Sequence, residues 1–157
     1  MISGLNLIDL ANQVFRPCNP DLIGINSIDV TLGDTLYRPT SAYTRQELDL
    51  SNLPDEDELY NKYSFDGAGF TLAPGSFCKA ITAEKFTMPH HVTGMFSLRS
   101  CIAQAGLEQS TSVWIRPGWE GHLILELSNF TNKDLILRAG LRIGQVHFFN
   151  LIDRSPF

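Results

Sequence analysis

Short apolar segments separated by turn residues fill the chain from residue 70 onward, and this pattern constrains the fold most strongly. No long helical pattern lies between them, and Gly, Pro, Asn and Asp residues mark the breaks. Short strands in close succession are typical of an all-β barrel or sandwich. The expected strands are 70–72, 76–82, 84–89, 92–98, 110–115, 122–128, 135–137 and 141–149.

The first part of the chain carries a helix and a strand. Apolar residues recur at three- and four-residue spacings over 5–15, which predicts a short amphipathic helix with Ser3 available as its cap. Residues 25–33 alternate as a strand, and its Asp29 is either a structural hydrogen-bond acceptor or a contact to a sugar hydroxyl. Gly33 and Asp34 predict a turn, and the polar stretch 39–69 predicts a surface loop with a helical turn near 56–63.

Length and charge limit the class of protein. At 157 residues, with 43% hydrophobic and 18% charged residues, the chain fits a single globular domain, expected over residues 1–157. A net charge of -5 with scattered basic residues argues against binding to nucleic acid. No apolar run approaches the length of a membrane span, and the N-terminus lacks the pattern of a signal peptide. We therefore expect a cytoplasmic protein.

The three cysteines, Cys18, Cys78 and Cys101, are odd in number and widely spaced, so we expect reduced thiols. A zinc site of the nucleobase-deaminase kind needs His-x-Glu and Pro-Cys-x-x-Cys, and neither motif occurs. His90 and His91 are adjacent, so on an extended chain their side chains point to opposite sides. The sequence therefore predicts no bound metal.

A single carboxylate interrupts the apolar strand at 122–128. Side chains alternate across a strand, so Glu126 shares one face with Ile124 while Leu125 and Leu127 occupy the other. A carboxylate among apolar residues suits a group that must accept and return a proton, which makes Glu126 the leading catalytic candidate. The alternative is an exposed Glu on the solvated face of an antiparallel strand.

A possible anion site follows the strand at 92–98. Ser100 can cap a short helix that Gly106 ends, with Arg99 immediately before it. A helix N-terminus beside an arginine is suited to binding an anion, and the alternative is an ordinary capped helix with a solvated arginine.

Five segments occur in a characteristic order: 25–33, 73–75 with Pro89, 99–100 with 106–107, 117–126, and 138–140 with 143–145. Together they resemble the dCTP deaminase branch of the trimeric dUTPase-like superfamily. The resemblance implies a mainly β fold, a distorted jelly roll or β-clip barrel with short helices, and active sites formed between the subunits of a homotrimer. It also makes a bacterial cell or a phage-infected host cell the expected setting.

The resemblance implies a metal-independent reaction at Glu126. The glutamate at this position activates a water that attacks C4 of cytosine and then passes the proton to the departing ammonia, so that dCTP becomes dUTP. Ser100 is implied to position the water or the substrate, and Asp29 matches a structural aspartate. Substrate or phosphate contacts are expected from Arg99, Cys101, Gln104, Ser112, Trp114, Arg116 and Gln145.

Some positions depart from the pattern of the resembling family. The aspartate of dUTPases and bifunctional deaminases, ten residues before the deaminase glutamate, is replaced by Arg116, which cannot act as a base at neutral pH. Arginines usual in the family are replaced by Gln104 and Trp114, and a serine by Cys101. Lost charge-assisted contacts weaken phosphate binding, and Arg142 or Arg116 is a candidate to compensate. The C-terminal tail that closes over the nucleotide in the family is short or missing here.

Three functions follow from these features. The first is a deoxycytidine nucleotide deaminase, most simply acting on dCTP. The second is a nucleotide-binding or regulatory protein on the same fold with weak or no catalysis, and the third is a dUTP diphosphatase, which Arg116 disfavours. No cofactor is required for the chemistry, and Mg2+ is left open as a companion of the phosphates.

Overall fold

The computed structural model describes residues 1–16, 18–41, 47–65, 68–109 and 113–152. Strands predominate, so the expected all-β class is confirmed. The helical elements are α1 (Leu5–Val14), the 3-10 turn η1 (Pro20–Leu22), α2 (Glu56–Leu59) and α3 (Ser100–Gln104). The strands are β1 (Ile28–Pro39), β2 (Tyr60–Ser64), β3 (Phe70–Leu72), β4 (Phe77–Thr87), β5 (Val92–Leu98), β6 (Leu107–Gln109), β7 (Trp114–Ile115), β8 (Glu120–Asn129), β9 (Leu135–Leu137) and β10 (Arg142–Asn150).

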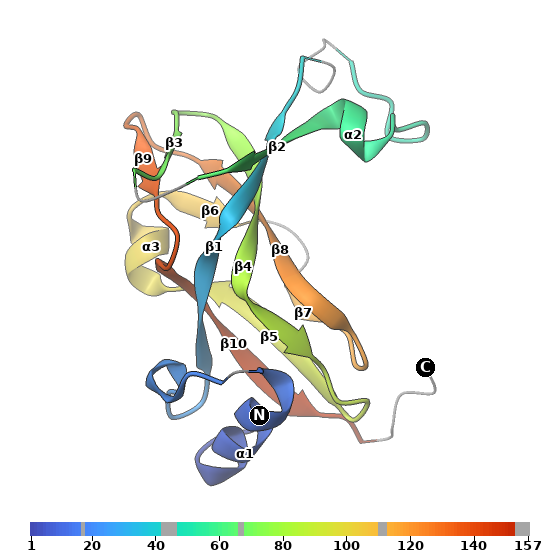
Figure 1. The fold of residues 1–157 in the computed structure, drawn as a ribbon, viewed down its shortest axis with the longest axis vertical. Coiled ribbons are helices and arrows are strands. Elements are labelled where there is room, and N and C mark those ends of the chain that lie inside the picture. Colours follow the sequence, from blue (N-terminus) through green and yellow to red (C-terminus); the bar gives the residue numbers. More distant parts are fainter. Residues whose placement is uncertain (17, 42–46, 66–67, 110–112, 153–157) are drawn as a thin grey trace.

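One long antiparallel sheet organises the described chain. Its strands follow the order β6-β8-β4-β1-β10-β5-β7, and β2 pairs with the second half of β1. The sheet curls, with α1 below its lower end and α2 beside its upper end (Figure 1). A separate antiparallel pair, β3 and β9, lies beside it. Because the neighbours in the sheet are far apart in the sequence, the fold is a jelly-roll type rather than a series of hairpins.

The core follows from alternation along the strands and from one face of α1. Leu125 and Leu127 of β8 are buried, whereas Glu126 between them faces the other way. Leu7, Leu10, Ala11 and Val14 form the buried face of α1. Phe86 of β4 is fully buried and lies 4.6 Å from the ring of Phe15 and 6.3 Å from that of Trp119, measured between centroids. These contacts join the end of α1 to the sheet.

Two predicted breaks are absent. The expected turn at Gly33 and Asp34 lies inside β1, and the separate strands 76–82 and 84–89 form the single strand β4. A Cβ atom at Gly33 would lie 2.9 Å from the carbonyl oxygen of Ile81. The glycine therefore permits close approach of β4 rather than a turn. The pairing of β1 with β4 shifts register here, between Leu32 and Leu36.

Within the stretch 39–69, the described residues 56–64 form a helical turn and a strand rather than a plain surface loop. The expected helical turn is α2, but β2 was not predicted, because its residues are largely polar and exposed. It pairs with β1 through backbone hydrogen bonds. Its sequence has no apolar alternation from which this strand could be predicted. In the described ranges, no helix has the length and apolar character needed to cross a bilayer.

Candidate functional site

Glu126 lies on the face of β8 opposite the core. This outer face is formed by the residues that alternate with the buried ones; Glu126 itself is half-buried and Ile124 is 50% exposed. The two predicted faces of the strand are confirmed, since Leu125 and Leu127 are in the core. Within a single chain Glu126 is therefore not a core carboxylate. Its position agrees with the alternative prediction of a Glu on the solvated face of an antiparallel strand. On this face it can reach a ligand.

Arg99 and Ser100 mark the start of α3, but the predicted serine cap is wrong. Arg99 is the N-cap residue, and its carbonyl oxygen accepts hydrogen bonds from the backbone N–H groups of Ile102 and Ala103 at 2.9 and 3.0 Å. Ser100 is the first helical residue, where its hydroxyl does not cap. The side chains of this short helix are exposed or half-buried, with Ser100, Cys101 and Gln104 among the exposed ones.

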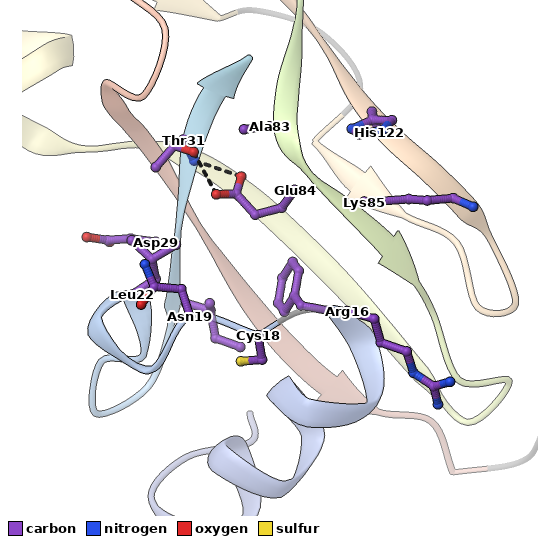
Figure 2. A pocket seen from close by; sticks show the side chains of 12 residues that line it. Arg16, Cys18, Asn19, Leu22, Asp29, Thr31, Ala83, Glu84, Lys85 and His122 are labelled. Atoms are coloured by element: carbon purple, nitrogen blue, oxygen red, sulfur yellow. Dashed lines mark hydrogen bonds between the residues drawn. The ribbon is translucent and has the colours of Figure 1, made fainter.

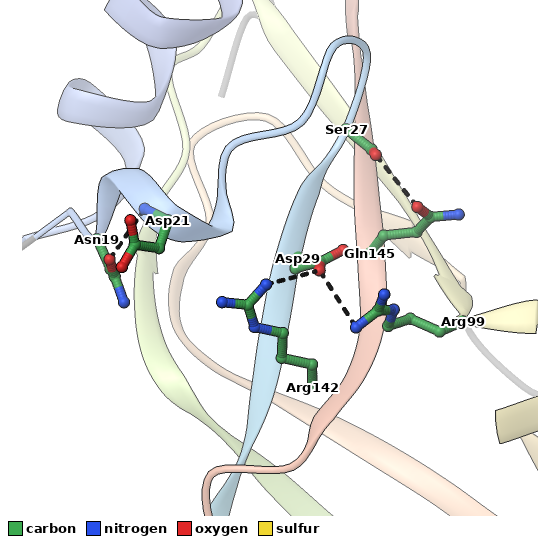
Figure 3. A network of polar contacts seen from close by, with 7 residues as sticks. All are labelled: Asn19, Asp21, Ser27, Asp29, Arg99, Arg142 and Gln145. Atoms are coloured by element: carbon green, nitrogen blue, oxygen red, sulfur yellow. Dashed lines mark hydrogen bonds and ion pairs between the residues drawn. The ribbon is translucent and has the colours of Figure 1, made fainter. Parts of the chain in front are cut away.

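Asp29 joins two arginines into one cluster (Figure 3). Its Oδ2 atom lies 3.6 Å from Nη1 of Arg99 and 3.9 Å from Nη1 of Arg142. The Asp29 side chain is 18% exposed, whereas the two arginines are 38% and 45% exposed. In this geometry Asp29 is the shared anion of two ion pairs rather than a hydrogen-bond acceptor of either arginine, and its contact to a sugar hydroxyl stays a prediction. Two cations around one carboxylate leave an excess positive charge at the surface.

Gln145 belongs to the same part of the sheet. On β10 it pairs with Asp29 of β1 on one side and with Ser97 of β5 on the other. Its Oε1 atom accepts a hydrogen bond from the Ser27 hydroxyl at 3.1 Å. Asp29, Gln145 and Ser97 therefore form a polar row across three strands, beside Arg99 and Arg142.

The remaining predicted site residues lie elsewhere. Trp114 of the edge strand β7 is 56% exposed, and its ring centroid lies 6.2 Å from that of Phe149. Arg116 follows β7 and is exposed. Ser112 lies outside the described residues. The structure thus groups Arg99 with Gln145, whereas β4, β1 and β10 separate the strand of Glu126 from β5.

A cavity of about 440 Å³ lies between the segment after α1 and the sheet (Figure 2). Phe15, Leu22 and Ile28 give it apolar walls. Its Glu84 carboxylate accepts hydrogen bonds from the backbone N–H and the hydroxyl of Thr31, at 2.8 and 2.7 Å. Partial burial raises the pKa of the Cys18 thiol. Neither Glu126 nor Ser100 lines this cavity, so it is separate from the predicted catalytic residues.

Sequence reasoning missed two features of these surfaces. The pairing of Arg142 with Asp29 needs the register between β1 and β10, which the sequence does not provide. The second feature is Lys79 of β4, which lies directly opposite Glu126 in the register of β4 with β8. Its place at an alternating position of a predicted strand was the available signal, since a lysine there interrupts an otherwise apolar row.

Solved structures define the class of fold. The chain is similar to a dUTPase from Streptococcus mutans, with a TM-score of 0.54, 16% identity and 87% of each chain covered. It is also similar to a 2'-deoxycytidine 5'-triphosphate deaminase from Agrobacterium tumefaciens, with a TM-score of 0.64 and 19% identity. That match covers 83% of this chain and 39% of the longer Agrobacterium chain. The expected dUTPase-like fold is therefore confirmed.

Sequence comparison then gives the family. A sequence model described as dCTP deaminase-like matches residues 2–151. A Corynebacterium efficiens protein named "dCTP deaminase, dUMP-forming" is 39% identical over 146 residues, which cover 90% of this chain and 73% of the relative. A Mycobacterium tuberculosis protein of the same name is 36% identical over 141 residues, covering 88% and 73%. The chain therefore belongs to the dCTP deaminase-like family, and the predicted class, a dCTP deaminase-type hydrolase, is confirmed at the level of the family.

Proposed function

We propose that this protein deaminates a deoxycytidine nucleotide, most simply dCTP, by hydrolysis without a metal. The observation that carries the proposal is the position of Glu126: a half-buried carboxylate on the outer face of β8, within the segment that matches the family. A carboxylate in this position can reach both a ligand and a water molecule. The names of the relatives support deoxycytidine triphosphate as the substrate class.

The proposed reaction needs one group that moves a proton twice. Glu126, ionised, takes a proton from water as the oxygen attacks C4 of the cytosine ring. It delivers this proton to ring atom N3, and then takes the proton of the new C4 hydroxyl and passes it to the exocyclic amino group, so that the bond from C4 to nitrogen breaks and ammonia leaves. The ring keeps the oxygen as a carbonyl, so the base becomes uracil. We assign to Ser100, exposed at the start of α3, the positioning of the water or the substrate.

The phosphates would bind at the arginine cluster. Arg99 and Arg142 share one carboxylate, that of Asp29, so the cluster keeps a net positive charge. Guanidinium groups hydrogen-bond phosphate oxygens well, and each has donors beyond those that face Asp29. Arg142 would then compensate for the charge that is missing at Gln104. No metal is needed for the chemistry in this proposal. Any Mg2+ would be bound to the phosphates of the nucleotide and would take no part in the deamination.

A homotrimer would bring Glu126 of one subunit close to the arginine cluster of another. Glu126 and the arginine cluster lie on different parts of one sheet, so a site that uses both is more readily built from two copies. Large apolar side chains are exposed on the isolated chain, including Ile124, Trp114 at 56% and Phe130 at 76%. An interface would bury such groups favourably. Light scattering coupled to size exclusion would show three copies, and a monomer at micromolar concentration would contradict this arrangement.

The product proposed is dUTP. The relatives are named as dUMP-forming, which requires release of pyrophosphate as well as ammonia. At the position where the family resemblance places the aspartate for that step, this chain has Arg116, exposed after β7. An arginine does not accept a proton at neutral pH. Quantifying ammonia and pyrophosphate from the same reaction separates the two outcomes, because equal amounts of both would show that dUMP is formed.

The test of the function is turnover of dCTP with chelator present, by wild type and by Glu126→Gln. Glu108→Gln is the matched control, since Glu108 is exposed on the neighbouring strand β6 and pairs with Ser128. We expect ammonia from wild type and the control and at least a 100-fold loss in Glu126→Gln. Nucleotide binding without ammonia from wild type would favour a binding or regulatory protein instead.

A further inference from the structure

The cavity of about 440 Å³ between the segment after α1 and the sheet has the size and the lining of a ligand site. Small-molecule sites are typically pockets of about 300–1,000 Å³ with apolar walls and a few polar groups. Phe15, Leu22 and Ile28 supply the apolar walls, and all three residues are buried. A flat ring that enters the cavity would leave water for these walls, which is favourable.

Polar groups reach the same cavity from two sides. On the sheet, the Glu84 carboxylate is held by two hydrogen bonds from Thr31, one to each of its oxygens (Figure 2). A carboxylate oxygen can accept more than one hydrogen bond, so Glu84 keeps capacity for an N–H group of a ligand. On the segment after α1, Asn19 contributes a side-chain amide, whose nitrogen carries two donors. These groups suit a ring that has both N–H donors and carbonyl acceptors, as a pyrimidine base has.

Asp29 connects this cavity to the arginine cluster. Its side chain lines the cavity, and its Oδ2 atom lies 3.6 Å from Nη1 of Arg99 and 3.9 Å from Nη1 of Arg142. A ligand in the cavity can therefore extend an anionic end onto two guanidinium groups, which bind phosphate oxygens well. A nucleotide combines the two parts that this surface accepts, a flat base and a phosphate chain.

We propose that the cavity is a second nucleoside site, which holds the base and sugar of a pyrimidine deoxynucleotide whose phosphates lie on the arginine cluster. The inference rests on the proposed function, which places nucleotide phosphates at that cluster. In the proposed trimer the base of the substrate lies at Glu126 of another subunit, whereas a base in the cavity is surrounded by residues of its own chain. One phosphate site then serves two binding modes. A nucleotide in the cavity inhibits turnover because it competes with the substrate for the arginines.

The alternative is a packing gap that remains where the segment after α1 crosses the sheet. Such a gap would bind no nucleotide, and its surroundings would not respond to phosphates at the arginine cluster. Cys18 separates the two possibilities, because its half-buried thiol lines the cavity. A base in the cavity covers this thiol, whereas a phosphate chain on the arginines alone does not reach into the cavity.

The first experiment measures how fast Cys18 reacts with a thiol reagent at pH 8, in Cys101→Ser protein so that the exposed thiol is absent. Cys78 does not interfere, since burial raises its pKa to about 12. With chelator present, millimolar dUTP should slow the reaction at least fivefold, and the same concentration of tripolyphosphate should change it less than twofold. In Arg142→Gln, about tenfold more dUTP should be needed for half protection. Equal rates with and without dUTP, or equal protection by tripolyphosphate, would overturn the proposal.

The second experiment blocks the cavity with Ala83→Trp, a change at an exposed residue of its wall. In the deamination assay, this variant should raise the inhibition constant of dUTP at least fivefold and leave kcat and KM for dCTP within twofold of wild type. Ala73→Trp, at an exposed position after β3, is the matched control and should change none of these constants.

An equal rise of KM and of the inhibition constant in Ala83→Trp would show that the cavity holds the base of the substrate itself, and would overturn the second binding mode. An unchanged inhibition constant would also overturn it. Absence of ammonia from wild type would refute the proposed function alone, because the labelling of Cys18 needs no turnover and still decides whether a nucleotide enters the cavity.

Discussion

The Oδ2 atom of Asp29 lies 3.6 Å from Nη1 of Arg99, and the same oxygen lies 3.9 Å from Arg142. Both separations are longer than hydrogen bonds, so the carboxylate holds the guanidinium groups by charge rather than by fixed donor geometry. Such a pair of cations can turn toward an incoming anion without breaking a hydrogen bond to Asp29. The cluster therefore combines a fixed location on the sheet with freedom of the arginine side chains.

Arg142→Gln should weaken triphosphate binding. The change removes one of the two positive charges and leaves Asp29 to neutralise the other, so we expect affinity for dCTP to fall about tenfold, or roughly 1.4 kcal/mol. Calorimetry in the Glu126→Gln background avoids turnover during the titration. Arg38→Gln is the matched control, because Arg38 is exposed on β1 beside β2. An unchanged affinity in Arg142→Gln would assign the phosphates to another part of the surface.

Much of the fold could be predicted from local pattern. The strands after residue 70 and the helix before residue 15 have alternation or helical spacing that reflects burial on one side. The breaks at Gly33 and between Thr82 and Glu84 could not be judged, because they depend on how β1 and β4 approach each other. A glycine that relieves a close contact looks the same in sequence as a glycine that makes a turn.

The candidate site was predictable by residue but not by arrangement. Glu126, Arg99 and Gln145 stood out through charge or through the family resemblance, whereas their neighbours depend on pairing between distant strands. Lys79 lies opposite Glu126 only through the register of β4 with β8. Arg142 reaches Asp29 across β10 and β1. In the sequence, Lys79 and Arg142 look like ordinary surface residues, and only the strand pairing of the folded sheet shows which residues they lie beside.

Glu84→Ala should destabilise the fold at the junction of β1 and β4. The carboxylate accepts two hydrogen bonds from Thr31, one from the backbone and one from the hydroxyl. Removing it leaves both donors without this acceptor in a partly buried place, at a cost of about 1–3 kcal/mol. Urea denaturation measures the change. In Glu120→Ala, where an exposed carboxylate loses its pair with Lys85, we expect the midpoint to stay close to wild type. Equal losses in both variants would contradict this account.

Gly144→Ala should be more costly than Gly140→Ala. A Cβ atom at Gly144 would lie 2.2 Å from a ring carbon of Phe96 and 2.8 Å from the carbonyl oxygen of Ser97. Phe96 is buried, so the ring has little room to move, and overpacking of this kind costs about 1–3 kcal/mol or more. A Cβ atom at Gly140 would have no other atom within 4 Å. The loss of stability there comes only from placing alanine at a φ of 78°, about 1 kcal/mol. Thermal unfolding of the two variants provides the comparison, and the reverse order would show that the core yields at Phe96.

The three cysteines should react with a thiol reagent in a fixed order. Cys101 is exposed, Cys18 is half-buried with a raised pKa, and burial raises the pKa of Cys78 to about 12. Since the thiolate is the reactive form, Cys78 should remain unlabelled in folded protein as the pH rises from 7 to 9, and all three should react in denaturant. Absorbance with a disulfide reagent at pH 8 should show a fast phase of one thiol, followed by a slower one. Cys101→Ser should remove the fast phase alone. Labelling of Cys78 that is faster than global unfolding would show that the sheet opens locally at β4.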